Sequence, residues 1–130
     1  MNRDDVLLSD FAKAGERLAE ALSQPETDVL RDACIQRFEF CFELAWKSVQ
    51  AVGRAYGHEC SSPRVAFGIA LRNGWIGDEV PWLDMLTARN QTTHTYRETL
   101  AQSVYAELPG FLRHLLELSQ ALRERLDETR

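Results

Sequence analysis

The stretch that decides the fold is residues 30–56, LRDACIQRFEFCFELAWKSVQAVGRAY, which Gly57 follows. Small or apolar side chains recur along it every three or four positions, as in an amphipathic helix. They are Leu30, Cys34, Phe38, Cys41, Ala45, Ser48 and Val52. Further apolar residues, among them Phe42 and Trp46, lie beside this stripe. A helix that is apolar on more than one side contacts several helices or a second subunit.

The residues before this stretch predict where the long helix begins and what precedes it. Ser23 and Glu26 are spaced as in a capping box, and Pro25 suits a first helical turn. We therefore expect the helix to begin near residues 24 to 27. Before it, an apolar stripe predicts another amphipathic helix from about Arg3 to Leu22. Its members are Leu7, Phe11, Ala14, Leu18 and Ala21.

The residues after the stretch predict two further helices and a break. Ser62-Pro63 starts a short helix that Asn73-Gly74 closes, because serine is a preferred N-cap and proline is tolerated just after it. Asp78 is the expected N-cap of the next helix. Threonines at 92, 93 and 95 weaken helix propensity, so we expect this helix to break close to Thr95.

A last helix is predicted from about Thr99 to Asp127. Thr95 with Glu98 has the spacing of another capping box, and Pro109-Gly110 should kink the helix. Its apolar stripe is Val104, Leu108, Phe111, Leu115, Leu118 and Leu122. The pattern predicts an all-α fold, an antiparallel up-and-down four-helix bundle with an extra short helix. Homodimerisation through one of the long helices would bury excess apolar surface.

Length and composition agree with a single domain over residues 1–130. The chain is 45% hydrophobic and has only 7 Gly and 4 Pro, so a packed core is favoured over a fold of many short strands. The net charge of −5 argues against non-specific nucleic-acid affinity over the whole surface, but not against a small cationic site. The start of the chain lacks a signal-peptide pattern, and no uncharged stretch is long enough to span a bilayer.

The three cysteines predict reduced thiols and a cytoplasmic protein. Their odd number without a signal peptide is typical of that compartment. Cys34 and Cys41 fall on the apolar stripe, so they are interpreted as core residues, and a zinc site would need closer pairs and more ligands. Phosphate-binding loops and Glu-x-x-His are absent from the sequence. We expect neither a cofactor nor a metal.

Glu39, Glu43 and Lys47 follow one another at four-residue steps along the long helix. The plain interpretation is a ladder of ion pairs on a solvated or partner-facing surface. The alternative is a pair of catalytic carboxylates.

The segment RNQTTHTY, residues 89–96, is dense in functional side chains. The guanidinium of Arg89 can clamp a phosphate and stabilise charge that develops on it. The imidazole of His94 can act as a general acid or base near neutral pH. These two groups suffice for metal-independent cleavage of RNA, in which the ribose 2′-oxygen attacks the adjacent phosphorus. The spacing also suits an Arg and a His that only cap carbonyls at a helix end.

Spacing predicts how these side chains would be arranged. Asn90 and His94 are four apart and would share a helix face, so the Asn90 amide could orient the imidazole. Arg89 and His94 are five apart, about 140° around a regular helix. Two motifs that meet across a dimer axis would therefore converge better than one motif alone. Tyr96 follows the expected break, so its hydroxyl should be exposed and available for covalent modification.

The sequence resembles a known family at several places in the expected order. The run QRFEFCFELAWK at residues 36–47 resembles the long-helix signature of the bacterial nucleotidyltransferase substrate-binding proteins. Residues 62–64, 82–86 and 89–96 follow in the order expected for that family, over about residues 5 to 125. The family belongs with the HEPN group of helical bundles. It is similar to HepT-type toxins, whose hallmark is R-x4-H-x-Y.

The resemblance implies a function for the motif. In HepT-type members the Arg and His form a ribonuclease site at a dimer cleft, and a minimal nucleotidyltransferase (MNT) encoded nearby silences the toxin by transferring AMP to the Tyr. Carried onto this sequence, catalysis falls to Arg89 and His94, a supporting polar role to Asn90, and AMP acceptance to Tyr96. The chain itself lacks the Gly-Ser and paired-Asp motif of nucleotidyltransferases.

Three hypotheses follow. The first is a HepT-like, metal-independent endoribonuclease of a two-gene toxin–antitoxin module, active on RNA as a homodimer and neutralised by an MNT that modifies Tyr96. The second is a non-catalytic substrate-binding subunit of a two-component nucleotidyltransferase. The third is a purely structural bundle in which the motif residues are incidental.

Overall fold

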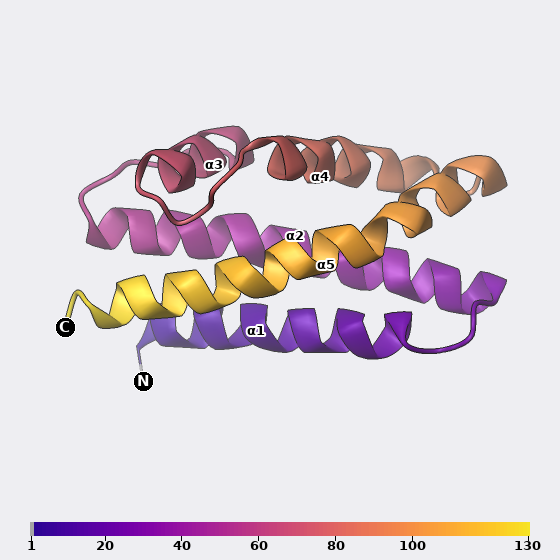
Figure 1. Ribbon diagram of the computed structural model, residues 1–130, viewed down its shortest axis with the longest axis horizontal. Coiled ribbons are helices and arrows are strands. Elements are labelled where there is room, and N and C mark those ends of the chain that lie inside the picture. The colour runs from indigo at the N-terminus through magenta and orange to yellow at the C-terminus, as the bar shows by residue number, and fades with distance from the viewer. Residues whose placement is uncertain (1) are drawn as a thin grey trace.

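A computed structural model describes residues 2–130, which form five α-helices and one 3₁₀ turn and contain no strand. In chain order these are α1 (Arg3–Leu22), α2 (Asp28–Ala55), α3 (Pro63–Arg72), α4 (Val80–Gln91), η1 (Thr92–His94) and α5 (Glu98–Asp127). Figure 1 shows successive long segments that run in opposite directions, with α3 and α4 following one another along one side of α2. The predicted all-α, up-and-down bundle is confirmed, and α3 and α4 together make its fourth member.

The helix α2 lies at the centre and packs on α1, α3 and α5. From Cys34 to Val52 its predicted stripe is fully buried. The Phe38 ring lies 5.5 Å from that of Phe111 on α5, and the Phe42 ring lies 5.7 Å from that of Phe67 on α3. The apolar residues on different sides of α2 therefore contact different helices of the same chain.

The helix α2 begins at the end of the predicted range of residues 24 to 27, but its cap differs from the sequence prediction. Thr27 is the N-cap, and its Oγ1 accepts a hydrogen bond from the Leu30 N–H at 3.0 Å. Ser23 instead ends α1, where its hydroxyl donates to the Glu20 carbonyl at 2.6 Å. Glu26 pairs with Arg31 at 2.8 Å. The predicted capping box of Ser23 and Glu26 is therefore wrong, because both side chains are engaged elsewhere.

The short helix α3 begins and ends where the sequence predicts. Its N-cap Ser62 accepts a hydrogen bond from the Val65 N–H at 3.3 Å, and Asn73 is its C-cap. Gly74 follows with a φ of +74°, a left-handed conformation that glycine adopts without strain. Gly57, with a φ of +85°, ends the turn after α2 in the same way.

The start of α4 and the segment between α4 and α5 also differ in detail from the prediction. The N-cap of α4 is Glu79, one residue after the predicted Asp78. The Asp78 carboxylate nevertheless accepts a hydrogen bond from the Val80 N–H at 3.0 Å. The break near Thr95 is confirmed, since α4 ends at Gln91 and the 3₁₀ turn η1 lies between Gln91 and Thr95. A capping box of Thr95 and Glu98 does not form, because the Thr95 hydroxyl donates to the Thr92 carbonyl at 2.9 Å.

Every member of the predicted stripe of α5 is buried. The helix continues through Pro109, and Figure 1 shows α5 changing direction between its orange and its yellow part. A bend is expected there because proline removes one hydrogen bond of the helix and its ring crowds the preceding turn.

Cys34 and Cys41 lie in the core as predicted, and all three cysteines are buried and free. Burial raises the pKa of the Cys41 thiol to about 12. No helix within residues 2–130 is both long and apolar enough to cross a lipid bilayer.

Candidate functional site

The residues of the R-x4-H-x-Y pattern lie at the junction of α4 and α5. Arg89 and Asn90 are in the last turn of α4, His94 ends η1, and Tyr96 is in the turn that precedes α5. The chain leaves the regular α-helix between Asn90 and His94, so the expected common helix face is not present. No hydrogen bond joins these two side chains in the described part of the chain.

Arg89 is held against α2. Its Nη1 donates a hydrogen bond to Glu43 Oε1 at 2.8 Å, and its guanidinium carbon lies 5.4 Å from the centre of the Phe42 ring. The Nε atom is buried and has no hydrogen-bond partner within residues 2–130. About a third of the side chain, 31%, is exposed. The guanidinium is therefore fixed in direction while part of it faces solvent.

Glu43 lies near the end of α4 and interacts with three side chains. Besides Arg89, its carboxylate accepts a hydrogen bond from Trp46 Nε1 at 3.1 Å and lies 3.8 Å from Lys47 Nζ. The predicted ion pair of Glu43 with Lys47 is present. The sequence does not predict the contact with Arg89, because no local spacing links side chains that are 46 positions apart.

Glu39 lies one helical turn before Glu43 and is half-buried. Burial raises the pKa of its carboxyl, and the neighbouring Thr92 and Arg89 oppose that rise. The predicted ladder does not extend to this residue, because no cation lies within ion-pair distance of Glu39 among residues 2–130. Two carboxyls of α2 therefore approach the α4–α5 junction, and of these Glu43 alone forms an ion pair within residues 2–130.

His94 and Tyr96 lie next to each other on the surface. Their ring centres are 6.0 Å apart and their planes make an angle of 75°. His94 is exposed, and Tyr96 is 75% exposed, as the sequence predicts for its hydroxyl. Arg97 lies over the Tyr96 ring at 5.8 Å. Neither the imidazole nor the phenol hydroxyl has a hydrogen-bond partner among residues 2–130, so both are open to a substrate or a second chain.

A shallow recess of about 530 Å³ lies beside Tyr96, between the first half of α2 and the turn before α5. Asp32 and Glu39 give it an acidic character, and Gln36, Thr95 and Tyr96 also line it. Arg89 faces the α2 carboxylates, whereas His94 faces solvent. No hydrogen bond joins the Arg89 and His94 side chains in the range that the structure covers.

Side chains that could ligate a metal are not gathered at this junction or elsewhere in the described chain. Within residues 2–130, no group of three or more His, Cys, Asp or Glu is placed to hold a metal ion.

Comparison with known proteins gives the family. The model of the family described as nucleotidyltransferase substrate-binding protein-like matches residues 7–124. A Haemophilus influenzae protein named as a probable ribonuclease HepT is 35% identical over 109 residues, which is 75% of this chain and 70% of that protein.

Two solved structures share the fold. One from Thermus thermophilus is 37% identical, with a TM-score of 0.83 over 87% of this chain and 98% of that one. Another, from Haemophilus influenzae, is described as the fold of a substrate-binding domain of a nucleotidyltransferase. It is 30% identical, with a TM-score of 0.76 over 93% of this chain and 99% of that one. The chain therefore belongs to the nucleotidyltransferase substrate-binding protein family.

Proposed function

We propose that this chain is a HepT-like, metal-independent endoribonuclease that acts on RNA as a homodimer. In this proposal Arg89 and His94 are catalytic, and Asn90 has a supporting polar role. An MNT partner neutralises the enzyme by adenylylating Tyr96, as in a two-gene toxin–antitoxin module. The observation that carries the proposal is the α4–α5 junction, where a fixed guanidinium precedes an exposed imidazole by five residues.

Each side chain has a role in the proposed cleavage. His94 removes the proton of a ribose 2′-hydroxyl, whose oxygen then forms a bond to the adjacent phosphorus. The bond from phosphorus to the 5′-oxygen breaks, and a second acid returns a proton to that oxygen. The products are a 2′,3′-cyclic phosphate and a 5′-hydroxyl. Arg89 stabilises the charge on the phosphoryl oxygens during attack.

A second copy of the chain supplies what one copy lacks. The Arg89 side chain points towards Glu43, whereas His94 points towards solvent. A single motif therefore offers one imidazole and one guanidinium that is already hydrogen-bonded to Glu43. Two motifs across a twofold axis would provide two imidazoles, one as base and one as acid. The exposure of His94 and Tyr96 leaves room for such an approach.

Cleavage of RNA by the purified protein tests the proposal. Wild-type protein should cleave single-stranded RNA in the presence of EDTA, and His94→Ala should lower the rate by about 100-fold or more. His114→Ala is the matched control, since His114 lies on α5 away from the motif, and it should cleave at the wild-type rate. Equal cleavage by His94→Ala and wild type would overturn the proposed mechanism.

The same assay separates the alternative. If the chain is a non-catalytic substrate-binding subunit, then wild type, His94→Ala and His114→Ala should all leave the RNA intact. It would bind a small molecule that the nucleotidyltransferase then modifies, and Tyr96 would stay unmodified.

A further inference from the structure

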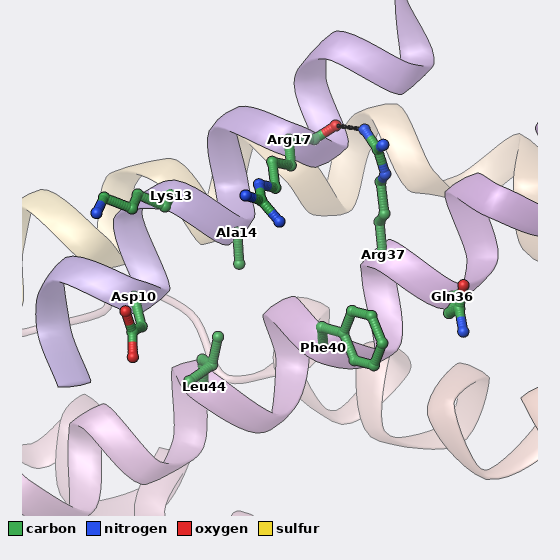
Figure 2. Close-up of a pocket in the computed structure, with 8 residues that line it drawn as sticks. All are labelled: Asp10, Lys13, Ala14, Arg17, Gln36, Arg37, Phe40 and Leu44. Carbon is green, nitrogen blue, oxygen red and sulfur yellow. Dashed lines mark hydrogen bonds between the residues drawn. The ribbon is translucent and has the colours of Figure 1, made fainter. Parts of the chain in front are cut away.

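A groove of about 510 Å³ runs between α1 and α2. Lys13 and Arg17 of α1 and Arg37 and Phe40 of α2 are among the residues that line it, and Figure 2 shows Arg37 and Phe40 on the α2 side facing Arg17. Arg37 crosses the groove, where its Nη1 donates a hydrogen bond to the Arg17 carbonyl at 2.8 Å. This bond uses the main chain of Arg17, and the guanidinium of that residue has no hydrogen-bond partner among residues 2–130.

The cations of this groove form no ion pair with the described part of the chain. None of Lys13, Arg17 and Arg37 lies within 4.0 Å of a carboxylate oxygen among residues 2–130. The chain has 20 acidic and 15 basic residues, so the positive charge of this groove is opposite in sign to the net charge of the chain. One carboxylate, that of Asp10, also lines the groove, at the Lys13 end and away from Arg37 (Figure 2). The groove therefore carries a local positive charge on an acidic protein.

An aromatic ring lies in the same groove. Phe40 is 57% exposed, although it belongs to a helix whose other phenylalanines are fully buried. Figure 2 shows its ring on the α2 wall, opposite the Arg17 side chain. Cationic side chains that follow a phosphate backbone, together with an exposed ring on which a base stacks, are the combination that single-stranded nucleic acids bind.

The groove lies next to the recess beside Tyr96, because one residue of α2 lines both. Gln36 lines both, and it lies one turn of α2 before Phe40 and one turn after Asp32. A strand that occupies the groove would thus pass Gln36 and arrive next to Tyr96 and the α4–α5 junction. It would also avoid the repulsion of Asp32 and Glu39 along most of its length.

We infer that the α1–α2 groove binds a single-stranded RNA segment next to the scissile phosphate, with Lys13, Arg17 and Arg37 on its phosphates and Phe40 under one base. This inference rests on the proposed ribonuclease function and names how its substrate is held. It also reconciles RNA binding with the acidic composition, because the favourable charge is confined to one groove.

Binding of a fluorescein-labelled single-stranded RNA to His94→Ala protein, followed by anisotropy over a range of salt concentrations, tests the groove. The double variant Lys13→Gln/Arg17→Gln should bind more weakly and should reduce the slope of log K against log salt by about 1.4. Phe40→Leu keeps an apolar side chain and should weaken binding about 5-fold or more. Arg72→Gln/Arg113→Gln makes the same change in net charge on exposed residues outside the groove and should leave the slope unchanged.

Each outcome decides one question. If the groove variants bind RNA with the affinity and salt slope of the control, the groove is not the RNA site, whether or not wild type cleaves RNA. If they lose binding but wild-type protein with His94 intact does not cleave RNA, the groove stands and the proposed cleavage fails. If sedimentation shows that the groove variants change the oligomeric state instead, the groove is an interface between protein chains and the inference is overturned.

Discussion

Glu43 on α2 binds Arg89 on α4 through a hydrogen-bonded ion pair of 2.8 Å that joins positions 46 residues apart. The pair ties the end of α4 to the central helix just before the chain breaks into η1. The guanidinium also packs over the face of the Phe42 ring, whose centre lies 5.4 Å from its carbon atom. Glu43 is thus a positioning residue for Arg89 in the proposed cleavage.

Replacing Glu43 should affect activity more than stability. Glu43→Gln keeps the size of the side chain but removes the charge that orients Arg89, so the rate of RNA cleavage should fall about tenfold or more. The loss in free energy of unfolding should be below about 1 kcal/mol, because both side chains are partly exposed. Lys47→Gln, which removes the weaker partner of Glu43, serves as the control and should leave the rate unchanged. Parallel losses of rate and melting temperature would contradict a positioning role.

Two phenylalanines of α2 that are two residues apart should differ in their contribution to stability. Phe38 is fully buried and stacks on Phe111, so Phe38→Ala should lower the free energy of unfolding by about 3–5 kcal/mol. Phe40 is largely exposed, so Phe40→Ala should change it by less than about 0.5 kcal/mol. Urea denaturation followed by circular dichroism measures both. Equal losses would mean that the ring of Phe40 is covered in solution.

Asp5 should make stability depend on acid pH. Its carboxylate receives hydrogen bonds from Arg123 at 2.9 Å and Arg130 at 2.7 Å, and these hold the pKa of Asp5 well below its ordinary value. A lowered pKa in the folded state stabilises the protein above the unfolded pKa of ~3.9, and that contribution is lost as the pH falls towards the folded pKa.

The melting temperatures of wild type and Asp5→Asn between pH 7 and pH 2 measure this contribution. The variant should melt lower than wild type at pH 7, and the two should approach each other below about pH 4. Asp10→Asn, on the same helix but without an ion pair among residues 2–130, should follow the wild-type curve. A constant difference between wild type and Asp5→Asn over this range would show that the effect is not ionic.

Modification of Tyr96 should depend on its hydroxyl and on a nucleotidyltransferase partner. In the proposed step the phenol oxygen bonds to the α-phosphorus of ATP and pyrophosphate leaves, so intact-mass spectrometry of the protein co-expressed with an MNT should find one added AMP. Tyr96→Phe should remain unmodified and escape neutralisation while it still cleaves RNA. Tyr105→Phe, a change to a half-buried tyrosine of α5, should be modified like wild type. Added AMP on Tyr96→Phe would place the acceptor elsewhere.

The sequence by itself determined the helices and the core. Periodic apolar side chains marked the stripes of α2 and α5, and glycine or serine marked the helix ends at Gly57 and Ser62, because these signals act between neighbours along one helix. The resemblance carried by residues 36–47 and 89–96 gave the family. Capping at Ser23 and Thr95 was predicted wrongly, since each hydroxyl donates to a carbonyl of the preceding turn instead. The α4 helix begins one residue later than predicted, although the Asp78 carboxylate accepts the Val80 N–H.

The tertiary structure alone decided how the candidate site is arranged. It placed Glu43 against Arg89, directed His94 to solvent rather than towards Arg89, and brought Arg17 of α1 to the wall opposite Phe40 of α2. Such contacts join residues far apart in the chain, and they depend on how whole helices pack. Local periodicity contains no information about which exposed faces come together, so the sequence could name the motif but not the groove between α1 and α2.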